Sequence, residues 1–144
     1  MSAPDAFVLK GAQALQVRGV TDRATADLDL AARSDLDDAL TALRGALNVD
    51  LGDGLLYQER VSPRPLAGEQ GPARGIRLAL EAVLDGASHS IGVDLVSDPR
   101  EVATSPRLTR LPRLAVPGVS PIEFPVYDLA AHLADKIAAT LDTY

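Results

Sequence analysis

The chain has 144 residues, a formal net charge of −6 and no cysteine. Its length suits one domain covering residues 1–144, and its 47% apolar content can fill one core. The lack of cysteine excludes disulfides and thiolate metal sites, and the negative charge argues against unspecific binding to polyanions. Neither a signal-peptide pattern nor an apolar run of membrane-spanning length is present, so we expect a cytoplasmic protein with no membrane contact.

The first feature is a short apolar run, Phe7-Val-Leu9, which predicts a strand ending at Lys10-Gly11. Residues 12–18 then predict a short helix. A glycine at a strand-to-helix junction lets the backbone approach a bound group, and the first amides of a helix favour phosphate. Lys10, Gly11 and Ala12 are therefore candidate phosphate contacts, although an ordinary tight turn has the same pattern.

The stretch Thr25-Ala-Asp-Leu-Asp-Leu30 predicts a strand that places Asp27 and Asp29 on one face. Two adjacent carboxylates repel each other, and the repulsion raises one pKa unless a cation lies between them. Asp27 and Asp29 are thus candidate Mg²⁺ ligands, and a solvated acidic face of an edge strand is the alternative. Thr25 would leave the same face and is a further candidate for the nucleotide site. A phosphate placed on its hydroxyl by an antitoxin would add negative charge beside the acids and block a triphosphate.

A packing helix without chemistry is expected next, from about Asp35 to Leu47, with Ser34 as its N-cap. Residues 55–61 predict a strand, and residues 62–75, rich in proline and glycine, predict a loop.

A β-hairpin is predicted around Asp85-Gly86, a strong two-residue turn signal that follows the alternating strand 76–84. The return strand places Ile91, Val93 and Leu95 on one face and Asp94 on the other. By its pattern Asp94 is either a solvated strand acid or a third acid beside Asp27 and Asp29.

Residues 98–126 contain six of the ten prolines and cannot be regular structure throughout. Arg107, Arg110 and Arg113 recur at every third position, which would align them along a polyproline-II segment. This spacing is the best candidate for contact with a phosphate backbone, and a solvated basic loop is equally compatible with it.

The last predicted element is a helix from about Asp128, with an apolar stripe and Lys136 at its border. The lysine either extends to water or reaches into a cleft beside the sheet. The chain has twelve arginines and only two lysines, Lys10 and Lys136, which favours a site that needs a compact ammonium group. His132 is expected on the helix surface, with a position facing the same cleft as Lys136 as the alternative, and His89 is expected to be exposed.

Three of these motifs resemble those of the polymerase-β-type nucleotidyltransferases, and most closely the AbiEii group with its MenT-type toxins. The opening motif is Phe7-Val-Leu-Lys-Gly-Ala-Gln-Ala-Leu15 followed by Asp27-Leu-Asp-Leu30. Ser90-Ile-Gly-Val-Asp-Leu95 is similar to the strand with a further acid, and Tyr127-Asp-Leu-Ala-Ala-His-Leu-Ala-Asp-Lys136 to the helix with an essential lysine. The resemblance implies an α+β fold with a mixed β-sheet and packed helices.

The resemblance also implies an activity. Asp27, Asp29 and Asp94 would bind two Mg²⁺ ions, Gly11 and the following amides would approach the phosphates of a nucleoside triphosphate (NTP), and Lys136 would neutralise charge during transfer. The acceptor in the family is typically the 3′ end of tRNA, whose modification blocks aminoacylation and growth, and an antitoxin is the expected partner. Two departures are Ala12, where the family usually has serine or glycine, and a chain short at both ends, without the late Arg-x-x-Asp-Leu motif.

Two alternatives remain open at this point. The chain could transfer a nucleotide to a protein or a small molecule, or it could be a non-catalytic remnant of the fold that binds the antitoxin.

Overall fold

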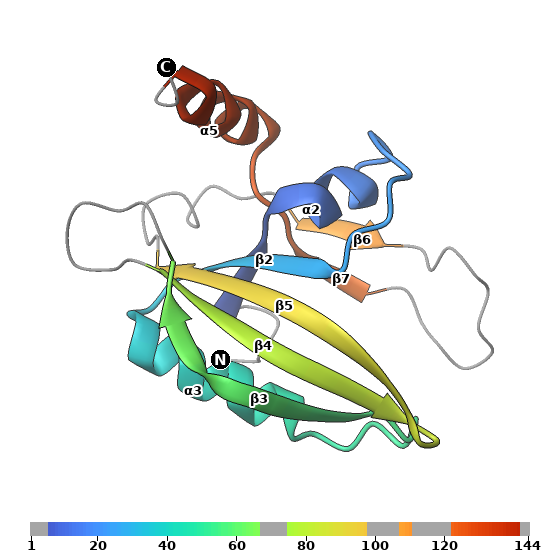
Figure 1. Cartoon of the computed structure of the whole chain (residues 1–144). Helices are drawn as coiled ribbons and strands as arrows, with labels where there is room; N and C mark the ends of the chain where they lie inside the picture. Colours follow the sequence, from blue (N-terminus) through green and yellow to red (C-terminus); the bar gives the residue numbers. More distant parts are fainter. Residues whose placement is uncertain (1–5, 67–74, 98–106, 111–121, 142–144) are drawn as a thin grey trace.

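The computed structural model of the chain describes residues 6–66, 75–97, 107–110 and 122–141. Its centre is a five-stranded sheet in the order β1-β2-β5-β4-β3 (Figure 1). β2 and β5 are parallel and the other neighbours are antiparallel, so the sheet is mixed. The strands are β1 (Phe7–Leu9), β2 (Asp27–Ala32), β3 (Leu56–Pro65), β4 (Gly75–Leu84) and β5 (Ala87–Ser97).

Three helices and a second, two-stranded sheet complete the described part of the chain. The helices are α2 (Gly11–Val17), α3 (Leu36–Leu47) and α5 (Leu129–Leu141), and the small sheet pairs β6 (Arg107–Arg110) with β7 (Ile122–Pro125). This arrangement confirms the expected α+β class with a mixed sheet and packed helices. No helix in these described stretches has the length and apolar content that a membrane crossing requires.

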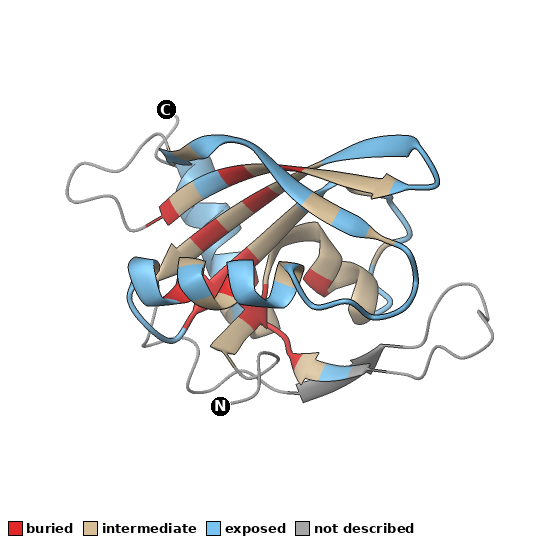
Figure 2. Ribbon diagram, turned by 90° about the horizontal axis from the view of Figure 1, so that it is seen from below, coloured by how far each residue is buried: buried red, intermediate tan, exposed pale blue. Residues whose placement is uncertain are grey.

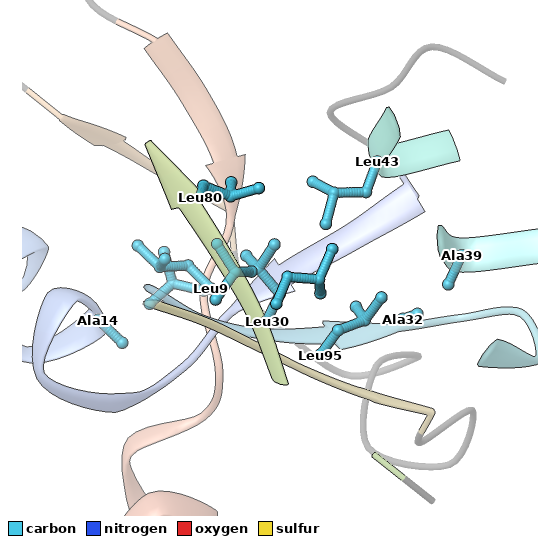
Figure 3. Packing of buried hydrophobic residues seen from close by; sticks show 11 residues of the cluster. Leu9, Ala14, Leu30, Ala32, Ala39, Leu43, Leu80 and Leu95 are labelled. Atoms are coloured by element: carbon cyan, nitrogen blue, oxygen red, sulfur yellow. The ribbon is translucent and has the colours of Figure 1, made fainter. Parts of the chain in front are cut away.

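The two faces of the sheet have different cores because side chains alternate along each strand. The larger core lies between the sheet and α3, where Leu30, Leu95 and Leu43 converge (Figure 3). A smaller cluster on the other face joins Val8 and Ala31 to Tyr127, the residue that leads into α5. α3 and α5 thus lie on opposite sides of the sheet (Figure 1). Asp27 lies two residues from Asp29 on β2, so both side chains leave the face of the sheet on which α5 lies.

The β4–β5 hairpin has the predicted turn, with Leu84 paired to Ala87. Both turn residues have positive φ angles, 49° at Asp85 and 82° at Gly86, as a type I′ turn requires. This turn type matches the twist of the two strands and fixes their register, which in turn sets the neighbours of Asp94.

Several boundaries differ from the predictions. β2 begins at Asp27 rather than Thr25, and the N-cap of α3 is Asp35, whose carboxylate accepts a hydrogen bond from the Asp38 amide at 3.0 Å. β3 continues to Pro65, into the predicted loop, and residues 67–74 of that loop lie outside the described residues. The segment from Arg107 is a strand and not polyproline II, while the third arginine of that pattern lies outside the described residues.

The apolar stripe of α5 is not part of the core. Leu133, Ile137 and Leu141 are 55%, 62% and 70% exposed, although their spacing predicted a packing face. Figure 2 shows the buried residues along the central strands, whereas β3 and the last helix are mostly exposed. α5 therefore meets the sheet through its first turns and through polar contacts.

Candidate nucleotide-binding site

The functional side chains lie in one row across the sheet. Cross-strand pairing places Arg77 of β4 beside Asp94 of β5, and Asp94 beside Asp29 of β2. Paired residues leave the same face of a sheet, so the three side chains are neighbours on the side of α5. The expected juxtaposition of Asp29 and Asp94 therefore follows from the parallel pairing of β2 and β5.

The turn after β1 closes the row at its other end. The Lys10 amide donates a hydrogen bond to the Asp29 carbonyl oxygen at 2.8 Å, which brings the turn over the acid. Gly11 has a φ of 60°, and a Cβ atom at this position would overlap the Asp29 carboxylate. A glycine is required here for both conformation and space, so the turn is more than an ordinary connection.

Asp27 lies two residues before Asp29 on β2 and is paired with Gly92 of β5. A Cβ atom on Gly92 would overlap the Asp27 carboxylate, so the glycine makes room for the acid. Asp27 is exposed, in contrast to the partly buried Asp29. The two acids of the motif thus share a face, as predicted, but have different environments.

The pKa of Asp29 is raised above its ordinary value. Burial is the main cause, followed by the negative charge of Asp94, while Lys136 acts in the opposite direction and Asp27 adds a smaller upward contribution. A partly buried carboxylate next to two others is costly to ionise. The site therefore favours a positive group at Asp29, either a side chain or a ligand.

Arg77 already supplies a positive charge to Asp94. Its guanidinium donates to both carboxylate oxygens, with distances of 2.6 and 2.9 Å. This bidentate pairing holds the pKa of Arg77 above its usual range. Sequence reasoning missed this residue, because the pair depends on the register of β4 against β5.

A pocket of about 300 Å³ lies between this row and α5. Five of the predicted site residues line it: Lys10, Gly11, Asp29, Asp94 and Lys136. Lys136 thus faces a cleft beside the sheet. Its positive charge partly offsets the rise in the pKa of Asp29. The remaining lining combines apolar and polar side chains: Leu30, Leu66, Val96, Tyr127, His132, Asp135 and Ala139.

Three predicted residues lie outside this lining. Asp27 is paired with Gly92, as described above, and Ala12 is in the first turn of α2. The Thr25 hydroxyl accepts a hydrogen bond from the Asp27 amide at 3.2 Å, in the turn before β2. The prediction that Thr25 belongs to the strand with the acids is therefore wrong.

Lys10 has partners of its own at the pocket wall. Its ammonium lies 4.0 Å from the centre of the Tyr127 ring and 3.6 Å from an Asp135 oxygen. The Tyr127 hydroxyl donates to the same Asp135 oxygen at 3.0 Å. Lys10 is thus held by protein groups, whereas the sequence suggested a phosphate contact.

His132 is buried, at 6% exposure, and the expectation of a surface histidine is wrong. Burial is the main cause that lowers its pKa, and the positive charge of Lys136 adds to this effect. The imidazole forms part of the pocket wall near Tyr127, with ring centres 6.4 Å apart. His89 is exposed, as expected.

Comparison with known proteins agrees with this geometry. A family model described as "Nucleotidyl transferase AbiEii toxin, Type IV TA system" matches residues 2–144. The chain belongs to this AbiEii family. No curated protein sequence matches it.

Solved structures with the same fold extend the comparison. MenT4, a nucleotidyltransferase toxin from Mycobacterium tuberculosis H37Rv, is similar with a TM-score of 0.61 and 22% identity, over 94% of this chain and 44% of that one. JHP933 from Helicobacter pylori is similar with a TM-score of 0.54 and 13% identity, over 93% of this chain and 49% of that one. At such identities the likeness shows the fold, and the AbiEii chain described here spans less than half the length of these proteins.

The donor set of this AbiEii chain fits a divalent cation in part. Asp27 and Asp29 offer the oxygen atoms that Mg²⁺ prefers, and burial, followed by the negative charge of Asp94, raises the pKa of Asp29. Asp94 is the third acid, but Arg77 contacts both of its oxygens. Within the described residues no group of three or more acids or histidines is arranged to hold a metal ion.

Proposed function

We propose that this chain transfers a nucleoside monophosphate from an NTP to the 3′ end of tRNA. The acceptor hydroxyl attacks the α-phosphorus, its proton is released, and the bond to the bridging oxygen breaks so that pyrophosphate leaves. Such a modified tRNA end cannot be aminoacylated, which would make the activity toxic.

One observation carries this proposal: the row of acids and the lysine face each other across one pocket. Asp29 and Asp94 come from neighbouring strands, and Lys136 comes from α5 on the other side of about 300 Å³ of space. A pocket with acids on one wall and a cation on the other suits a metal-bound polyphosphate. The AbiEii family match supports the same reaction class.

Each residue then has a distinct role. Asp27 and Asp29 would hold Mg²⁺, with Asp94 as a further ligand, and the ions would activate the acceptor hydroxyl and neutralise the triphosphate. Gly11 leaves room for the Asp29 carboxylate, because a Cβ atom at this position would overlap it, and so lets the acid lie beside the turn. Lys136 would stabilise the negative charge that develops on the phosphates. His132, Tyr127 and Val96 would exclude water from one side of the pocket.

The test is incubation of the purified chain with Mg²⁺, each labelled NTP in turn and total tRNA, followed by a denaturing gel. We expect label on tRNA, and we expect Asp27→Ala to abolish it without unfolding the chain. Asp37→Ala is the matched control, because this acid is exposed on α3, on the opposite face of the sheet. Retained transfer by a folded Asp27→Ala variant would refute the metal assignment.

A second candidate is a non-catalytic module of the same fold. It is favoured by the pairing of both Asp94 oxygens with Arg77, because an acid that already has a cationic partner has less need of a metal ion. The gel separates the two candidates. NTP binding without transfer to tRNA, protein or a small molecule would support the module.

An antitoxin is the partner that this proposal implies, since the family belongs to a toxin-antitoxin system. Expression of the chain with and without its cognate antitoxin, followed by growth measurement, would test it. Growth arrest by the chain alone, relieved by the antitoxin, is the expected result.

A further inference from the structure

We infer that Asp135 is a positioning residue, which docks α5 against the sheet together with Tyr127 and Lys10 and so aims Lys136 into the pocket. This inference rests on the proposed function for the role of Lys136. The docking itself is independent of that function.

The inference starts from the way in which α5 meets the sheet. Its first turn is fixed by Asp128, whose carboxylate accepts from the amides of Ala130 and Ala131 at 3.0 and 3.1 Å. The preceding Tyr127 is held by its amide, which donates to the Leu9 carbonyl oxygen at 2.9 Å. From residue 133 to 141, however, every residue of the helix is exposed.

Asp135 links this exposed part of the helix to the sheet. One of its oxygens accepts the hydrogen bond from Tyr127 at 3.0 Å and lies 3.6 Å from the Lys10 ammonium. Lys10 also lies over the Tyr127 ring, so each of the three groups contacts the other two. Tyr127 is only 2% exposed, which makes it a rigid base for the cluster.

The consequence concerns the next residue in the chain. Lys136 follows Asp135 directly, and both line the pocket opposite Asp29. Because the apolar stripe of α5 does not pack on the described core, apolar contacts cannot fix the rotation of this half of the helix. The Asp135 cluster supplies that restraint, and within it Lys10 has a structural role.

The experiment uses Tyr127→Phe, Asp135→Asn and Lys136→Ala in the full chain. Tyr127→Phe keeps the buried ring beneath Lys10 and removes only the hydroxyl, while Asp135→Asn keeps the shape and removes the charge. Lys136→Ala is the matched control, because it alters the neighbouring residue without touching the cluster. Amide hydrogen exchange is measured over 133–141 and over the β4–β5 hairpin.

We expect exchange in 133–141 to rise about tenfold in Tyr127→Phe, the effect of losing one hydrogen bond to a charged group. Asp135→Asn should also raise it, because the acceptor loses its charge and with it the attraction of Lys10. The hairpin should be unchanged in every variant, and 133–141 should be unchanged in Lys136→Ala. Unchanged exchange of 133–141 in Tyr127→Phe and Asp135→Asn would overturn the inference.

A binding measurement tests the link to Lys136. We expect Asp135→Asn to weaken NTP binding, and to have no further effect on the Lys136→Ala background. An equal loss in both backgrounds would show a general structural defect and would contradict positioning through Lys136. If the wild-type chain binds no NTP, the proposed function and the aim of Lys136 fail, while the exchange data still decide the docking.

Discussion

At the scale of single residues, Gly11 is the position where the backbone lies against an acid of the candidate site. We predict that Gly11→Ala loses transfer activity, because its Cβ atom would overlap the Asp29 carboxylate. Gly19→Ala is the matched control, since Gly19 has a similar φ of 71° but nothing within 4 Å of the added atom. Both variants should lose roughly 1–2 kcal/mol of unfolding free energy from the left-handed backbone. Only Gly11→Ala should displace the acid.

Urea unfolding and the tRNA gel check this pair. If Gly19→Ala loses as much activity as Gly11→Ala, backbone strain and not the contact with Asp29 explains the loss.

Asp29 gives a second prediction at this scale. Its raised pKa means that folding disfavours the charged form, so ionisation lowers the free energy of unfolding as pH rises through that pKa. Asp29→Asn removes the charge, and we expect this variant to be more stable than the wild type at pH 7 in metal-free buffer. The difference should shrink as the pH is lowered through the raised pKa and disappear below the ordinary pKa of 3.8, where the acid is protonated in both the folded and the unfolded chain.

Urea titrations at several pH values, with a chelator present, measure this difference. A variant that is less stable than the wild type at pH 7 would contradict the prediction. We thus expect Asp29→Asn to gain stability and to lose activity. Such a trade-off is typical of residues that are kept for function at the expense of stability.

Individual residues were predictable where a short pattern fixes them. Alternation along a strand places Asp27 and Asp29 on one face of β2, and it places Asp94 on the face of β5 opposite the apolar side chains. Arg77, Tyr127 and Asp135 were not predictable, because their contacts depend on register and on the placement of α5. A bidentate arginine or a tyrosine–carboxylate contact between distant segments leaves no local signal in one sequence.

At the scale of elements, the N-cap of α3 differs between the sequence prediction and the structure. The sequence favours Ser34 as the cap, whereas the Asp35 carboxylate accepts from the Asp38 amide. We predict that Asp35→Ala lowers the free energy of unfolding by about 1 kcal/mol. Ser34→Ala should change it by less than about 0.5 kcal/mol, as a surface substitution does. Denaturant unfolding of both variants measures the two free energies. A larger loss of unfolding free energy in Ser34→Ala than in Asp35→Ala would favour Ser34 as the cap.

Elements with strong local signals were predicted well. The Asp85-Gly86 turn and the strands beside it are formed as expected, since turn chemistry and alternation agree there. The stripe on α5 misled, because spacing predicts which residues share a face and not what covers that face. The buried His132 shows the same limit, since the side of α5 that meets the sheet carries polar residues.

At the scale of the whole molecule, the site is made by topology. Its acids come from two interior strands, its glycine turn from the end of β1 and its lysine from the last helix. Sequence order alone did not show that β2 and β5 would be neighbours; the family resemblance supplied that expectation. The fold then explains why motifs so far apart in the chain face one pocket.

The parallel pairing of β2 with β5 has a kinetic consequence. Parallel neighbours need a long connection, and here α3, β3 and β4 all lie between the two strands in the chain. Non-local pairing of this kind forms slowly. Asp29 and Asp94 can meet only after the ribosome has released β5, and Lys136 emerges later still, so under the proposed function a nascent chain would have no complete site. In refolding experiments a Mg²⁺-dependent signal should accompany the slowest folding phase, and its appearance in an early phase would contradict this order of assembly.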